Sequence, residues 1–137
     1  MLVHPGGPFW AGKDDGAWSI AKGLYEHGDE NPIEAAKREF REETGFEAEG
    51  RFIDLGELKQ PSRKVVHAWA VDQDLDAGRI VSNTFTLELP RNSGNLKEYP
   101  EVDRARWFHV EQARRKILKG QRDFIDRLMA ALEYPPK

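Results

Sequence analysis

The sequence predicts a single α/β or α+β domain in which short strands are interleaved with three helices. The chain has 137 residues, enough for one domain with a hydrophobic core. Short apolar runs of strand length are separated by polar turns, and three other segments carry apolar residues at helical spacing. There is no internal repeat, low-complexity segment or linker. The predicted domain therefore spans residues 1–137.

Composition excludes several classes of function. The net charge is −3 with both signs interspersed, which argues against binding to a nucleic-acid backbone. Zero cysteines exclude a disulfide scaffold and a thiolate metal site. No apolar run reaches transmembrane length, and residues 1–4 are not a signal peptide. We expect a soluble, cytoplasmic protein without nucleic-acid or membrane partners, and its oligomeric state is left open.

The N-terminal third predicts two strands and one helix. Residues 2–4 form the end of a strand before a Pro-Gly-Gly-Pro turn, and residues 18–21 alternate as a second strand. After a polar loop, Asn31 is a good N-cap and Pro32 suits the first helical position. Ala36 and Phe40 belong to the apolar stripe of this helix, and Gly45 ends it.

The remainder predicts more strands and two closing helices. Residues 51–58 and 64–71 form two strands around a turn, the second covered on both faces, and residues 84–89 and 104–109 form two more. Residues 90–103 are polar and are predicted as a loop. Trp69 and Trp107 are predicted core residues. Helices are expected over residues 110–117 and 121–132.

Three carboxylates gather near the end of the first helix. Glu39, Glu42 and Glu43 are three and four residues apart, so they share one helical face. Like charges at this spacing destabilise a helix unless something offsets their repulsion. A divalent cation is the natural partner, because Mg²⁺ is usually held by a few carboxylates together with substrate phosphates.

The surrounding segment resembles the Nudix box. Residues 38–46, REFREETGF, match the core pattern of Arg, Glu, an apolar residue, any residue, two Glu, any residue, Gly and an apolar residue. Upstream, seven residues separate Glu30 from Arg38, as in the family pattern. Gly23 precedes Glu30 by six intervening residues rather than five, and we place the extra residue at Asp29 in the loop.

The resemblance implies the Nudix fold, an α+β sandwich with a mixed β-sheet between helices. The family usually has a complete strand before the one that ends in residues 2–4. We therefore expect either a sheet without its usual first strand or a native start further upstream.

The resemblance also assigns roles to individual residues. Core metal ligands would be Glu39 and Glu43, with Glu42 sharing a second ion and the Gly23 carbonyl adding an oxygen. A further ligand would be Glu101, six residues before Trp107, with Glu98 and Glu88 as weaker alternatives. The cation would be Mg²⁺, with Mn²⁺ as an alternative. Structural members of the motif would be Glu30, Arg38 and Gly45, with Arg38 orienting a glutamate.

The reaction that this resemblance implies is the attack of water on phosphorus in a nucleoside diphosphate derivative. The base would be Glu39 first, Glu42 second, or a glutamate in a later loop. Substrate-binding candidates are Lys22, Arg63 and Trp10, each with a plain alternative: a solvated lysine, an ordinary turn charge and a packed aromatic. The four histidines, His4, His27, His67 and His109, show no metal-ligand spacing.

The substrate remains a choice among small-molecule nucleotides. Residues 18–23, WSIAKG, are similar to the Trp-x-x-Pro-Lys-Gly run of diadenosine polyphosphate hydrolases, with Ala21 in place of proline. This similarity favours a dinucleoside polyphosphate such as diadenosine tetraphosphate. The alternatives are a nucleoside or deoxynucleoside triphosphate, ADP-ribose, a nucleotide-binding module without turnover, and a structural domain with a vestigial site.

Overall fold

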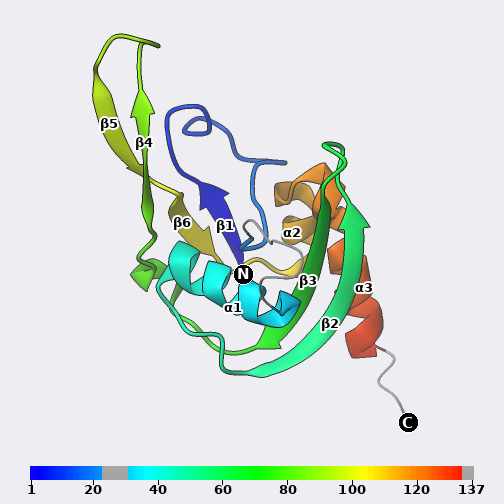
Figure 1. The fold of residues 1–137 in the computed structure, drawn as a ribbon. Coiled ribbons are helices and arrows are strands. Elements are labelled where there is room, and N and C mark those ends of the chain that lie inside the picture. The colour runs from blue at the N-terminus through cyan, green and yellow to red at the C-terminus, as the bar shows by residue number, and fades with distance from the viewer. Residues whose placement is uncertain (23–30, 134–137) are drawn as a thin grey trace.

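The computed structural model describes residues 1–22 and 31–133 (Figure 1). The predictions for Gly23, Asp29 and Glu30 lie outside these residues. In chain order the elements are β1 (Leu2–Pro5), α1 (Pro32–Thr44), β2 (Arg51–Lys59), β3 (Val65–Asp72), the 3₁₀ turn η1 (Ala77–Arg79), β4 (Thr84–Glu88), β5 (Leu96–Pro100), β6 (Val102–Arg106), α2 (Val110–Lys116), the 3₁₀ turn η2 (Lys119–Gln121) and α3 (Arg122–Glu133).

The strands form three antiparallel pairs within an α+β architecture. β1 pairs with β6, β2 with β3, and β4 with β5. The α+β class is confirmed, but the described strands do not join into one continuous mixed sheet. In Figure 1, α1 and α3 lie on either side of the β2–β3 hairpin, with α1 against β3 and α3 against β2.

The segment predicted as a strand over residues 18–21 makes only isolated bridges. Ser19 pairs with Val3, and the backbone of Trp18 bonds to Lys116 and Leu118. The Ile20 amide donates instead to the side chain of Gln121, at 3.0 Å. This side-chain acceptor takes the place of a strand neighbour, so the prediction of a full strand is wrong.

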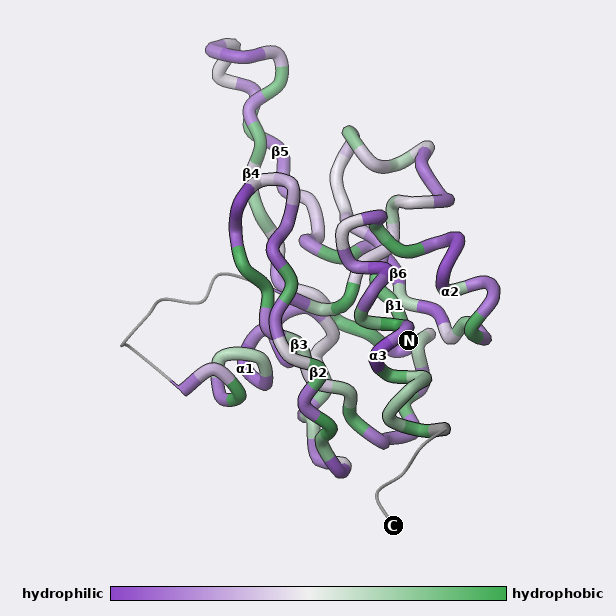
Figure 2. Tube along the Cα trace, turned by 90° about the vertical axis from the view of Figure 1, so that its right-hand side faces the viewer, coloured by the Kyte–Doolittle hydropathy of each residue, from purple (hydrophilic) through white to green (hydrophobic). Residues whose placement is uncertain are grey.

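The loop predicted over residues 90–103 is also wrong, because it contains β5 and the start of β6. The β4–β5 hairpin extends away from the rest of the chain (Figures 1 and 2), and hydrophilic colours predominate at its tip. A strand with both faces near solvent has no buried face to mark with apolar residues. The sequence of β5 therefore carries little strand signal.

The tryptophan predictions were only partly right. The side chain of Trp107 is 51% exposed, and its indole N–H donates to the Leu75 carbonyl at 2.7 Å. Trp107 follows β6 because β6 ends at Arg106, three residues earlier than predicted. Trp69 is half-buried and stacks on the His67 ring, with centroids 3.9 Å apart. In β3 only Ala68 is buried, so this strand is not covered on both faces.

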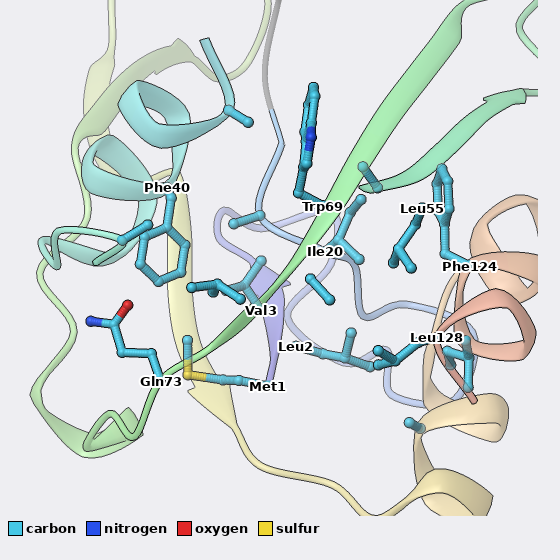
Figure 3. A pocket seen from close by; sticks show the side chains of 18 of the residues that line it. Met1, Leu2, Val3, Ile20, Phe40, Leu55, Trp69, Gln73, Phe124 and Leu128 are labelled. Atoms are coloured by element: carbon cyan, nitrogen blue, oxygen red, sulfur yellow. The ribbon is translucent and has the colours of Figure 1, made fainter. Parts of the chain in front are cut away.

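The core has two parts that meet at β1. Leu2 packs with Trp18 and Ile117, whereas Val3 packs with Val102 and Ala105 on the β6 side. A cavity of about 340 Å³ lies between β1, β3, α1 and α3. Figure 3 shows its apolar lining, with Phe40 from α1, Trp69 from β3 and Leu128 from α3.

Candidate active site

The site is built on α1, whose two ends are fixed by local chemistry. The Asn31 side chain accepts a hydrogen bond from the Ile33 amide at 3.0 Å, and Pro32 begins the helix. Gly45 ends it in the left-handed conformation, with φ of 78°, and donates to the Arg41 carbonyl at 2.7 Å. The helix predicted from these signals is confirmed.

Arg38 lies between two carboxylates of the helix. Its Nη1 atom is 2.8 Å from Oε1 of Glu39 and 3.4 Å from the carboxylate oxygens of Glu42. The Glu39 side chain is only 12% exposed, whereas that of Glu42 is 34% exposed. A guanidinium in this place offsets part of the repulsion between the two carboxylates and fixes the orientation of Glu39.

Glu43 is held in a setting that opposes its ionisation. The pKa of the Glu43 carboxyl is raised to about 8, chiefly by burial and to a lesser extent by the nearby carboxylates of Glu39 and Glu101. The backbone N–H of Lys22 donates to Oε2 of Glu43 at 3.0 Å and acts in the opposite direction. Without a cation, the Glu43 carboxyl is therefore mostly protonated at neutral pH.

Glu39 shows the same tendency. Burial is the main cause that raises the pKa of the Glu39 carboxyl, partly countered by the positive charge of Arg38. The carboxylates of Glu42 and Glu101 also raise this pKa. Glu101 therefore lies within electrostatic range of both Glu39 and Glu43.

Backbone hydrogen bonds connect Glu101 to α1 through Asn83. The Asn83 amide donates to the Glu42 carbonyl, and the Glu101 amide donates to the Asn83 carbonyl, both at 2.8 Å. On the other side, the Gly6 amide donates to the Glu101 carbonyl at 2.9 Å. Sequence reasoning missed Asn83 and Gly6 as supports for the site. Their contacts join distant segments, and the spacing from Glu101 to Trp107 was the only signal for this region.

The weaker alternatives for the fourth carboxylate lie on the β4–β5 hairpin. Glu98 accepts a hydrogen bond from the Thr84 hydroxyl at 2.7 Å, and Glu88 faces Leu96 in the strand register. Neither contributes to the pKa shifts of Glu39 and Glu43. Of these three glutamates, only Glu101 is among the groups that shift the pKa values of Glu39 and Glu43.

The predicted substrate-binding residues are spread more widely. Lys22 lies beside Glu43 through its backbone amide, and its side chain is exposed. Trp10 lies in the loop after β1, with the Lys13 ammonium 5.0 Å from its ring centre. Arg63 lies at the β2–β3 turn with φ of 71°, where Gln60 bonds to Gly120 beside α3. The structure does not bring Arg63 to the carboxylates.

The donor set suits a hard divalent cation. Carboxylate oxygens are the ligands that Mg²⁺ and Mn²⁺ take in proteins, and a cation would favour the ionised form of Glu43 that burial now opposes. Among residues 1–22 and 31–133, no three acidic or histidine side chains already converge as a compact metal cluster. The residues that could hold such an ion are Glu39, Glu42, Glu43 and Glu101.

These features define an α+β protein with a carboxylate site at the end of a helix and a loop glutamate opposite it. The comparison with family models matches residues 3–128 to the NUDIX domain. The chain belongs to the Nudix hydrolase family, enzymes that act on pyrophosphate bonds of nucleoside diphosphate derivatives, which are small-molecule nucleotides.

The other comparisons add no relatives. The comparisons with curated proteins and with solved structures found no match. No helix in the part of the chain that the structure describes is long and apolar enough to cross a membrane.

Proposed function

We propose that this Nudix hydrolase cleaves a pyrophosphate bond of a dinucleoside polyphosphate such as diadenosine tetraphosphate, in a Mg²⁺-dependent reaction. The observation that carries the metal requirement is the raised pKa of Glu43 beside Glu39 and Glu101. The observation that favours this substrate is the run Trp18 to Gly23, in which Lys22 directly adjoins Glu43.

Glu39, Glu43 and Glu101 would hold the cation, with Glu42 sharing a second ion. When bound, Mg²⁺ lowers the pKa of a coordinated water and stabilises the leaving phosphate oxygen. The positive charge of Lys22 acts on Glu43 and would also attract the substrate phosphate.

Glu39 is the proposed general base and Glu42 the second choice. As the water oxygen bonds to phosphorus, the base accepts one water proton and the bridging P–O bond breaks. Burial raises the pKa of Glu39, so this carboxyl accepts a proton more readily than an exposed one. Arg38, 2.8 Å from Glu39, orients the carboxylate for this transfer.

A nucleotide panel tests the proposal. The wild type is incubated with Mg²⁺ and diadenosine tetraphosphate, nucleoside triphosphates or ADP-ribose, and the products are separated by chromatography. We expect the fastest turnover with the dinucleoside polyphosphate. Glu42→Gln and Glu43→Gln should each lower turnover at least about 100-fold, because even indirect support of a metal is worth about 10–100-fold.

Glu47→Gln is the matched control. Glu47 is a nearby glutamate that pairs with Arg41 at 3.4 Å and faces solvent, so its turnover should match the wild type. Faster cleavage of a nucleoside triphosphate or ADP-ribose would replace the proposed substrate. Tight nucleotide binding without any turnover would indicate a non-catalytic binding module.

A further inference from the structure

His4 is a fully buried ionisable residue that the proposed reaction does not use. Its side chain is 0% exposed, and both ring nitrogens have partners. Nδ1 lies 3.0 Å from Oδ1 of Asp103 on β6, and Nε2 lies 2.7 Å from the Lys13 carbonyl. The ring also packs edge-on against Trp18, with centroids 5.1 Å apart.

The two hydrogen-bond partners of the His4 ring lie on different segments of the chain. The Lys13 carbonyl can only accept, so Nε2 donates to it. Nδ1 is hydrogen-bonded to the Asp103 carboxyl group. His4 therefore joins three segments that are distant in sequence: β1, the loop after it and β6.

The same three segments surround Glu101. Two residues after His4, the Gly6 amide donates to the Glu101 carbonyl at 2.9 Å. Two residues after Glu101, Asp103 receives the His4 ring. The strand register between β1 and β6 shifts at His4 and Pro5, next to this contact. The His4–Asp103 bond therefore restrains the register of β1 against β6 near the start of β6, directly after Glu101.

Close packing leaves Glu101 little freedom once this contact is made. A Cβ atom at Gly6 would approach the Pro100 carbonyl oxygen far inside van der Waals contact, so the backbone directly after β1 touches the backbone at the end of β5. Any slip of β1 against β6 would displace Glu101 relative to Glu39 and Glu43.

We propose that His4 is a positioning residue that holds Glu101 opposite the carboxylates of α1, and thereby sets the affinity of the site for a divalent cation. The inference rests on the proposed role of Glu101 as a metal ligand. His4 itself touches neither the cation nor the substrate.

Mg²⁺ binding measured by titration calorimetry tests the inference without depending on turnover. His4→Phe keeps the ring and its contact with Trp18 but loses both hydrogen bonds. We expect Mg²⁺ affinity to fall about 10-fold or more, the range typical of residues that orient a metal ligand. Glu101→Gln should weaken binding as well, and the double variant should bind no more weakly than Glu101→Gln alone.

His67→Phe is the matched control. His67 also bonds to a carboxylate, with Nε2 2.7 Å from Oδ1 of Asp54, but it lies on β3 away from Glu101. A purely structural effect of losing a His–Asp pair would appear in both variants as a lower melting temperature. Only His4→Phe should weaken Mg²⁺ binding. If His4→Phe does not fold, Asp103→Asn weakens the same contact and should show the same pattern.

Three results would separate the possibilities. Unchanged Mg²⁺ affinity in folded His4→Phe would overturn the positioning role alone; if His4→Phe does not fold, the same result in Asp103→Asn would do so. The positioning role would also be overturned if the double variant bound Mg²⁺ more weakly than Glu101→Gln alone, by the factor that His4→Phe costs on its own. Mg²⁺ binding by the wild type without hydrolysis of any nucleotide would overturn the proposed function alone. A wild type that binds no Mg²⁺ would overturn both.

Discussion

Glu43 combines two opposing requirements in one carboxyl group. Burial and the neighbouring carboxylates favour its protonated form, whereas a metal ligand must be ionised. The Lys22 amide supplies only one hydrogen bond toward the ionised form. The residue is therefore poised to respond to a cation, and both its protonation and its metal binding should be visible in stability.

This predicts how the metal-free protein responds to pH. The folded-state pKa of Glu43 is about 8, above the ordinary value of 4.5, so the folded state holds the proton more tightly. The resulting stabilisation is complete below about pH 4.5 and is lost as pH rises through about 8, with a slope of at most ~1.4 kcal/mol per pH unit. Thermal unfolding in a chelator from pH 5 to 9 measures it.

Glu43→Gln provides the control, because it cannot titrate and should remove this part of the pH dependence. Saturating Mg²⁺ should also reverse this pH dependence of stability, since the cation binds the ionised carboxylate. An identical pH profile for Glu43→Gln and the wild type would contradict the assignment.

At the scale of elements, α1 depends on its C-terminal glycine for more than backbone conformation. Gly45 has φ of 78°, and a Cβ atom there would lie 2.9 Å from the Val81 carbonyl oxygen. The Val81 amide in turn donates to the Thr44 carbonyl at 2.8 Å. The end of the acidic helix is thereby fixed against the segment that leads to Asn83 and Glu101.

Gly45→Ala should therefore destabilise the protein by about 1–3 kcal/mol, from strain at positive φ together with the close contact. Gly94→Ala is the matched control, because Gly94 has φ of 80° but open space where a Cβ would stand. Urea unfolding of both variants gives the comparison. Equal losses would mean that the contact with Val81 contributes nothing.

The elements that were predictable from sequence are those with local signals. The cap at Asn31, the stop at Gly45 and the apolar spacing between them all lie within α1 or directly beside its ends. β5 could not be found in this way, because an exposed hairpin needs no apolar face. The bridging of Glu101 by Gly6 and Asn83 joins three distant segments, and no local pattern encodes it.

At the scale of the whole molecule, an apolar cavity of about 340 Å³ lies between β1 and β3. It is lined by apolar side chains, among them Phe40 on α1. Voids cost stability because the surrounding atoms lose dispersion contacts. The sequence predicts the apolar face of each helix or strand. It does not predict how closely these faces fit together, because that depends on tertiary packing.

Ala70→Val should fill part of this cavity and suits a strand position. We expect the free energy of unfolding to rise by about 0.5–2 kcal/mol, the usual gain from filling a void. Ala11→Val, at an exposed loop position, should change it by less than about 0.5 kcal/mol. Denaturant unfolding measures both, and a loss of stability in Ala70→Val would show that the space is not open to a larger side chain.

The central claim is that the carboxylate face of α1 is a divalent-cation site. Electron paramagnetic resonance of Mn²⁺ tests it most directly, because bound Mn²⁺ loses the sharp signal of the free ion. We predict saturable binding by the wild type and its loss in the Glu39→Gln/Glu43→Gln double variant, with Glu47→Gln unchanged. Equal Mn²⁺ binding by the wild type and the double variant would contradict the claim.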